Sequence, residues 1–201
     1  MVAKGALPRV LVTAVVVVLL LVGAFLPLWE MKADVRSLGM FSEPLISVSI
    51  SGTGIKGRLE SFNDLNKMFG IRPLRPEEFV ELRLFPVAVG GTILTMVLWA
   101  VWARRWLWAL ALVLGWGLPL GIIALTQLRL AIMALTRDPN ASYYMETTAL
   151  MLPVFGNKQV LGAELFTRPG AGLILFLVAA LLFTVLSLRL ERMKRPLGHQ
   201  S

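Results

Sequence analysis

Few residues in this chain are of a type that performs nucleophilic or acid–base chemistry. The 201 residues include no cysteine and a single histidine, His199. One histidine near the end of a basic tail does not assemble a Ser-His-Asp triad or a histidine-rich zinc site. The carboxylates Glu77, Glu78 and Glu81 have the spacing of a solvated helix end and lack a nucleophile or metal partner. The sequence therefore predicts that the protein is not an enzyme.

Methionine is the one remaining side chain that could hold a metal. Its thioether sulfur selects Cu(I) and needs no cysteine, although methionine more commonly fills gaps in apolar cores. Methionines lie between or beside the apolar runs at Met31, Met40, Met68, Met133, Met145 and Met151, with no Met-x-x-Met cluster among them. We keep Met40 and Met68 as Cu(I) candidates, and the preferred prediction is that no cofactor is bound.

The composition indicates a membrane protein. Hydrophobic residues make up 57% of the chain, charged residues 16%, and the mean hydropathy is +0.74. Four runs contain no charged residue and no histidine: 10–29, 84–103, 106–128 and 170–188. In one alternative the third helix extends past Arg129 to residue 136. About 20 helical residues cross a hydrocarbon core of about 30 Å, so each run predicts a transmembrane helix. The first run is longer than the apolar part of a signal peptide, which favours an uncleaved span.

The basic residues predict how the chain is threaded. The formal net charge is +8. Segments 1–9, 104–105 and 189–201 hold eight of the 20 basic residues and one of the 12 acidic ones, which leaves twelve basic and eleven acidic residues for loops 30–83 and 129–169. The positive-inside rule therefore predicts four helices with both termini in the cytoplasm of a bacterium and both long loops outside the inner membrane. The basicity orients the protein, and nucleic acid is not a predicted partner.

The first long loop carries secondary-structure signals of its own. Ile46, Val48 and Ile50 alternate with serines, and a Gly-containing turn follows, which predicts a β-hairpin over 46–59. A helical face predicts a helix over 61–69, with Ser61 as its N-cap and Gly70 after its end. The expected fold is a membrane all-α protein, with a small α+β outer cap that contains the hairpin. A unit this small buries little core, so we expect it to rest on loop 129–169, the membrane surface or a partner.

Several outer motifs, taken together, have a familiar order and spacing. They are Pro27-Leu28-Trp29, the stretch FNDLNKMFGI at 62–71, Asp138-Pro139-Asn140-Ala141, and PVFGNKQ at 153–159. The chain resembles small four-helix bacterial membrane proteins of unassigned activity that are encoded beside nitrous-oxide reductase maturation genes. The resemblance implies a loose association with periplasmic copper-enzyme assembly. Lys67 and Ile71 stand where those relatives tend to have His and Met, so this chain lacks the best copper ligand that the resemblance suggests.

The leading functional prediction is a non-enzymatic membrane accessory or assembly protein whose outer cap binds a protein partner. The candidate partner-binding residues come from the outer motifs: Asn63, Leu65, Asn66, Gly70, Asp138, Asn140, Lys158 and Gln159. The alternative is a structural subunit or a self-associating tetraspan with claudin-like architecture, although the paired cysteines of that family are absent. A third interpretation is a copper-binding or lipid-binding module.

Overall fold

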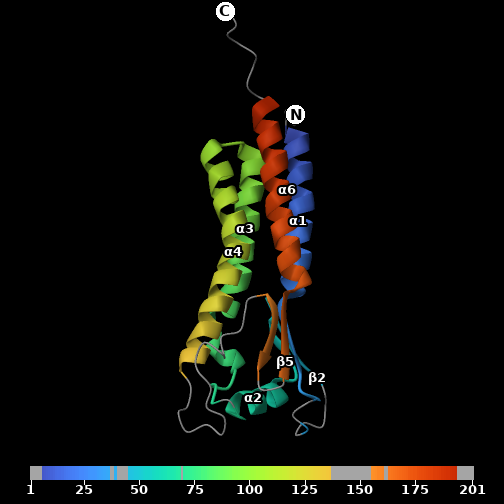
Figure 1. Ribbon diagram of the computed structural model, residues 1–201. Helices are drawn as coiled ribbons and strands as arrows, with labels where there is room; N and C mark the ends of the chain where they lie inside the picture. Colours follow the sequence, from blue (N-terminus) through green and yellow to red (C-terminus); the bar gives the residue numbers. More distant parts are fainter. Residues whose placement is uncertain are drawn as a thin grey trace, which may run out of the picture.

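The computed structural model describes residues 6–36, 39, 45–68, 70–136, 155–160 and 163–193, and it consists of a bundle of long helices and a small antiparallel sheet (Figure 1). The bundle is formed by α1 (Ala6–Phe25), α3 (Val80–Trp102), α4 (Arg105–Leu135) and α6 (Ala171–Met193). Each of these four helices is long and apolar enough to cross a membrane. The chain therefore has the architecture of a multi-pass membrane protein.

The bundle core is aromatic and has two polar cross-links. Trp99 and Phe183 pack edge to face, with ring centroids 5.2 Å apart. Trp108 Nε1 donates a hydrogen bond to Ser187 Oγ (2.9 Å), and Trp116 Nε1 donates to Thr184 Oγ1 (3.0 Å). Both bonds join α4 to α6, and each such bond in a membrane helix pair contributes about 1 kcal/mol.

The helix ends differ from the sequence prediction at three places. The first helix ends at Phe25 rather than at residue 29, because Pro27 lacks an N–H and disfavours helical geometry at the residue before it. The second helix begins at Val80 rather than at residue 84, so Pro86 lies inside α3. The helix predicted at 106–128 continues to Leu135, close to the longer alternative.

The sheet has five strands in the order β3-β2-β1-β5-β4, and every neighbouring pair is antiparallel. Its strands are β1 (Pro27–Asp34), β2 (Leu45–Ser51), β3 (Gly54–Gly57), β4 (Gly156–Val160) and β5 (Ala163–Pro169). Strands β2 and β3 form the predicted hairpin. The other three strands, β1, β4 and β5, are not predicted from the sequence. The pairing of β1 with β5, a strand of the second long loop, is not predicted either. Trp29, which marked a helix end in that prediction, instead lies buried in β1.

One face of the sheet is covered by α2 (Leu59–Met68) and by the segment that leads through the short 3₁₀ helix η2 (Pro76–Glu78) into α3. We call the sheet, α2 and this segment the cap. Helix α2 begins at Leu59, two residues before Ser61, the predicted N-cap residue. The Phe62 N–H donates a hydrogen bond to the Arg58 carbonyl (3.0 Å). Gly70 has a left-handed φ of 69° and its N–H donates to the Lys67 carbonyl (3.1 Å), the geometry expected just past a helix end.

The cap is joined to the bundle through α1–β1 and β5–α6, in addition to the segment that enters α3. Strand β1 follows α1 directly and β5 runs directly into α6, so the α1–α6 helix pair continues as the β1–β5 strand pair (Figure 1). The Gly170 N–H donates to the Leu28 carbonyl (3.0 Å), and a Cβ at Gly170 would overlap the backbone of Pro27. A Cβ at Gly172 would lie 2.5 Å from the Gly23 carbonyl oxygen. The backbones therefore cross so closely at this junction that it requires glycine.

Candidate interaction surface

The sheet has one face packed in the cap core and one face turned away from α2. Buried apolar side chains from β1, β2 and β5 form the covered face: Trp29, Met31, Ala33, Ile46, Val48, Ile50, Ala163 and Leu165. The opposite face, which we call the open face, carries the alternate residues of the same strands. Residues directly opposite in an antiparallel pair share a face, so the register arranges the open face in three rows across the strands.

The first row lies nearest the helices and contains Lys56, Ser49, Glu30 and Arg168. Arg168 Nε donates to Glu30 Oε2 at 2.7 Å, and the guanidinium makes a second contact through Nη2. Arg168 is well exposed, so this ion pair contributes at most about 1 kcal/mol to stability. Its main effect is to hold β1 and β5 in register where they leave the bundle.

The second row has an exposed aromatic ring among polar neighbours. It runs Ser47, Lys32, Phe166 and Asn157 across four strands. Phe166 is 36% exposed, although its sequence neighbours Leu165 and Thr167 are buried on the covered face. An aromatic side chain surrounded by polar groups is the composition of a protein-binding hot spot.

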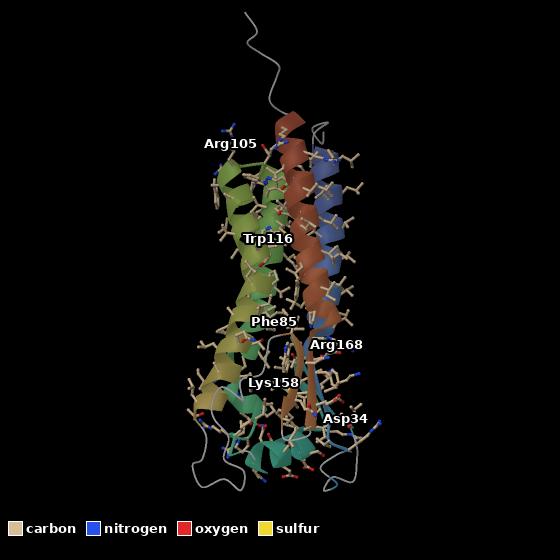
Figure 2. All side chains as sticks on the ribbon, viewed as in Figure 1. Asp34, Phe85, Arg105, Trp116, Lys158 and Arg168 are labelled. Carbon is tan, nitrogen blue, oxygen red and sulfur yellow. The ribbon has the colours of Figure 1, made fainter. Side chains whose placement is uncertain are left out.

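The third row lies at the end of the sheet farthest from the helices and is acidic. Asp34 and Glu164 stand opposite each other, between Leu45 and Gln159. The Arg36 backbone N–H donates to Asp34 Oδ1 (3.1 Å), and its side chain lies 3.6 Å from Oδ2. Figure 2 shows Arg168 near the bundle and Asp34 farther from it. The open face thus has basic residues towards the helices and carboxylates at its tip.

Strand β4 forms one edge of the sheet, and within the described residues it pairs only with β5. Gln159 and Asn157 belong to the open face, and both are exposed. Lys158 lies opposite Leu165 on the covered side and is half-buried. Of the predicted partner-binding residues, Gln159 is therefore placed on the open face and Lys158 on the edge beside it.

The predicted candidates on and around α2 serve the cap itself. Asn63 holds the backbone of Leu74: its Nδ2 donates to the Leu74 carbonyl (3.2 Å) and its Oδ1 accepts from the Leu74 N–H (2.7 Å). Leu65 and Asn66 are 2% and 4% exposed, and Gly70 is buried at the helix end. A partner could not touch these buried residues without displacing the cap. Asp138 and Asn140 lie outside the described residues.

Of the open-face residues, only Gln159 is among the candidates predicted from sequence, and Lys32, Phe166 and Arg168 are among those that the prediction missed. The polar–apolar alternation of residues 30–34 is a signal that could have found Lys32. Phe166 interrupts the alternation that begins at residues 163–165, and only the pairing of β5 with β1 places its ring on the open face.

The described residues contain no group of three or more His, Cys, Asp or Glu side chains that could hold a metal ion. Met31 is buried in the cap core and Met96 in the bundle core, so these two do not form a thioether pair. Of the Cu(I) candidates, Met40 lies outside the described residues, and for Met68 only its backbone position at the end of α2 is described.

Comparison of the chain with protein-family models, with curated proteins and with solved structures gives no match.

Proposed function

We propose that this protein is a non-enzymatic accessory protein of the bacterial cytoplasmic membrane whose open face binds a protein partner in the periplasm. The observation that carries the proposal is Phe166, an exposed aromatic ring at the centre of a polar, charged sheet face. That face belongs to a cap with its own core, which is joined to the bundle through α1–β1 and β5–α6. The four candidate membrane spans carry no charged group in their central parts, which favours an anchoring role over transport.

The proposed orientation places both termini and the α3–α4 turn in the cytoplasm. It is supported by the basic residues at that end and by Trp102 and Trp106. Both rings are exposed beside the turn, as aromatic residues at a membrane interface are.

Labelling of introduced cysteines tests this orientation. The chain has no cysteine of its own, so a maleimide can label this protein only at the introduced cysteine. A membrane-impermeant maleimide should label Ser47→Cys in intact cells with an opened outer membrane, and Arg104→Cys only after the inner membrane is permeabilised. The reverse pattern would refute the orientation.

Truncation of the exposed ring should weaken the proposed partner contact. We expect Phe166→Ala to reduce partner binding about 10- to 30-fold, which corresponds to the roughly 1.5–2 kcal/mol typical of a hot-spot aromatic residue. The measurement is the amount of partner that co-purifies with the protein in mild detergent. Phe155→Ala is the matched control, because Phe155 is also exposed but lies outside the three rows. Equal loss from both variants, or none from Phe166→Ala, would count against the open face.

We further propose, on the resemblance alone, that the partner belongs to the assembly of a periplasmic copper enzyme such as nitrous-oxide reductase. The test is the identity of the co-purified protein. A partner with no link to copper-enzyme assembly would remove this part of the proposal and leave the accessory role standing.

The alternative, a self-associating tetraspan, has two observations on α4 in its favour. Gly117 and Gly121 form a small-xxx-small pair on α4, and a Cβ added at either position would meet no atom of another helix within 4 Å. Helix α4 also buries the smallest share of its apolar stretch, 22%, among the four helices. These glycines could therefore contact α4 of a second copy, because small residues allow close approach of membrane helices. Homo-oligomers on crosslinking, without a foreign protein, would favour this function.

A further inference from the structure

A cavity of about 900 Å³ opens between α4 and α6 at the end of the bundle opposite the cap. Its walls come from the first turn of α4, with Arg105, Trp106 and Trp108, and from the last turns of α6, with Leu188 and Arg192. Figure 2 shows Arg105 at this end of α4. The cavity is thus at the level where the bundle would meet the membrane surface, and it has no part in the open face.

The charged residues that line the cavity favour an anion. Arg105 and Arg192 contribute guanidinium groups from opposite helices, and Glu191 is the one carboxylate among the lining residues. The first turn of α4 adds to this potential, because its N-cap Arg104 makes no side-chain capping bond and the first amide groups of a helix carry partial positive charge. Two arginines that line the same cavity from two helices provide donors for a phosphate group.

Another part of the lining is apolar, and one of its rings is held in place. Trp108, Ala109 and Leu188 form it, and the Trp108 ring is fixed by its bond to Ser187. A free phosphate ion would use only the arginines and leave this wall uncovered. A ligand with a phosphate head and a hydrocarbon tail matches both parts of the site.

We propose that this cavity binds an anionic phospholipid, with the phosphodiester between Arg105 and Arg192 and an acyl chain along Trp108, Ala109 and Leu188. Basic pockets between membrane helices near a charged leaflet bind anionic headgroups in this way. Under the proposed orientation the lipid belongs to the cytoplasmic leaflet, but the site itself does not depend on the function proposed for the cap.

The experiment measures the binding of lipids with brominated acyl chains to the delipidated full-length protein in mild detergent. Bromine quenches nearby tryptophan fluorescence, and Trp106 and Trp108 line the site. We expect phosphatidylglycerol to quench the fluorescence saturably and phosphatidylcholine to quench it only weakly. The double variant Arg105→Gln/Arg192→Gln should bind phosphatidylglycerol about 25-fold more weakly, since each arginine near an anionic group contributes about five-fold.

The matched control is Arg104→Gln/Arg189→Gln, which removes the same charge at the same end of the bundle from exposed residues outside the cavity lining. It should bind phosphatidylglycerol within about three-fold of the unmodified protein, because these exposed guanidinium groups lie outside the cavity lining and would not contact a headgroup bound in the cavity. The variant Ala109→Phe narrows the apolar wall without changing charge and should also weaken binding. Equal loss in both arginine pairs, equal quenching by phosphatidylcholine, or full displacement of the lipid by excess inorganic phosphate would overturn the proposal.

Discussion

Replacing Gly170 with valine is expected to destabilise the protein by about 3 kcal/mol or more, because the glycine lies where two backbones cross. The added Cβ would overlap the Pro27 carbonyl, which is backbone and cannot rotate away as a side chain could. The same displacement would break the bond from the Gly170 N–H to the Leu28 carbonyl. Both changes separate α1–β1 from β5–α6 at the point where the cap joins the bundle.

The measurement is the thermal unfolding midpoint of the purified protein in detergent, followed by tryptophan fluorescence. A loss of about 3 kcal/mol should lower the midpoint by roughly 6–12 °C for a chain of this size. Gly90→Ala is the matched control, because a Cβ at Gly90 meets no atom within 4 Å and alanine favours helix. A Gly170→Val midpoint equal to that of Gly90→Ala would show that the junction is not closely packed.

Replacing Asn63 with alanine is expected to open the cap locally. Its amide group satisfies both the N–H and the carbonyl of Leu74, a residue that is 5% exposed. Each buried backbone group left without a partner costs about 1–3 kcal/mol, so the expected local loss is about 2–3 kcal/mol. The segment from Gly70 to η2 depends on this contact to lie against α2, whereas the bundle does not.

Hydrogen exchange measured by mass spectrometry should detect this change in peptides that cover residues 70–79. A loss of about 2 kcal/mol corresponds to exchange roughly 30-fold faster there, with peptides of α6 unchanged. Asn63→Asp should not rescue the protection, because a carboxylate keeps the acceptor but cannot donate to the Leu74 carbonyl. Asn157→Ala removes an exposed asparagine and should leave exchange at 70–79 as it was. Protection unaltered in Asn63→Ala would contradict the structural role given to this residue.

The elements that can be predicted from the sequence are those with a clear hydrophobic pattern within a single segment. Length and the absence of charge predict the four helices, and the alternation around Val48 predicts the β2–β3 hairpin. Strand β1 also alternates, from Trp29 to Val35, but it follows an apolar helix without a break, so its start was assigned to that helix. Strand β4, with the sequence GNKQV, has almost no apolar periodicity of its own.

The open face could not be predicted because it depends on pairing between distant segments. Glu30 and Arg168 are 138 residues apart, and their contact follows only from the antiparallel packing of α1 and α6. The outer motifs selected Asn63, Leu65 and Asn66, whose distinctive pattern reflects helix packing and a backbone clamp. The pairing of β5 with β1 is needed to place Phe166 on the side of the sheet that faces away from the cap core.

The most direct test of a partner-binding open face is photo-crosslinking in living cells from a photoreactive amino acid at position 166. We expect one discrete adduct with a foreign protein of the periplasmic side, formed from position 166 but not from position 155 or position 117. Failure to form an adduct from position 166, or adducts only of the mass of a homodimer, would contradict a partner-binding open face. The homodimer result, if strongest from position 117, would instead support the self-associating tetraspan.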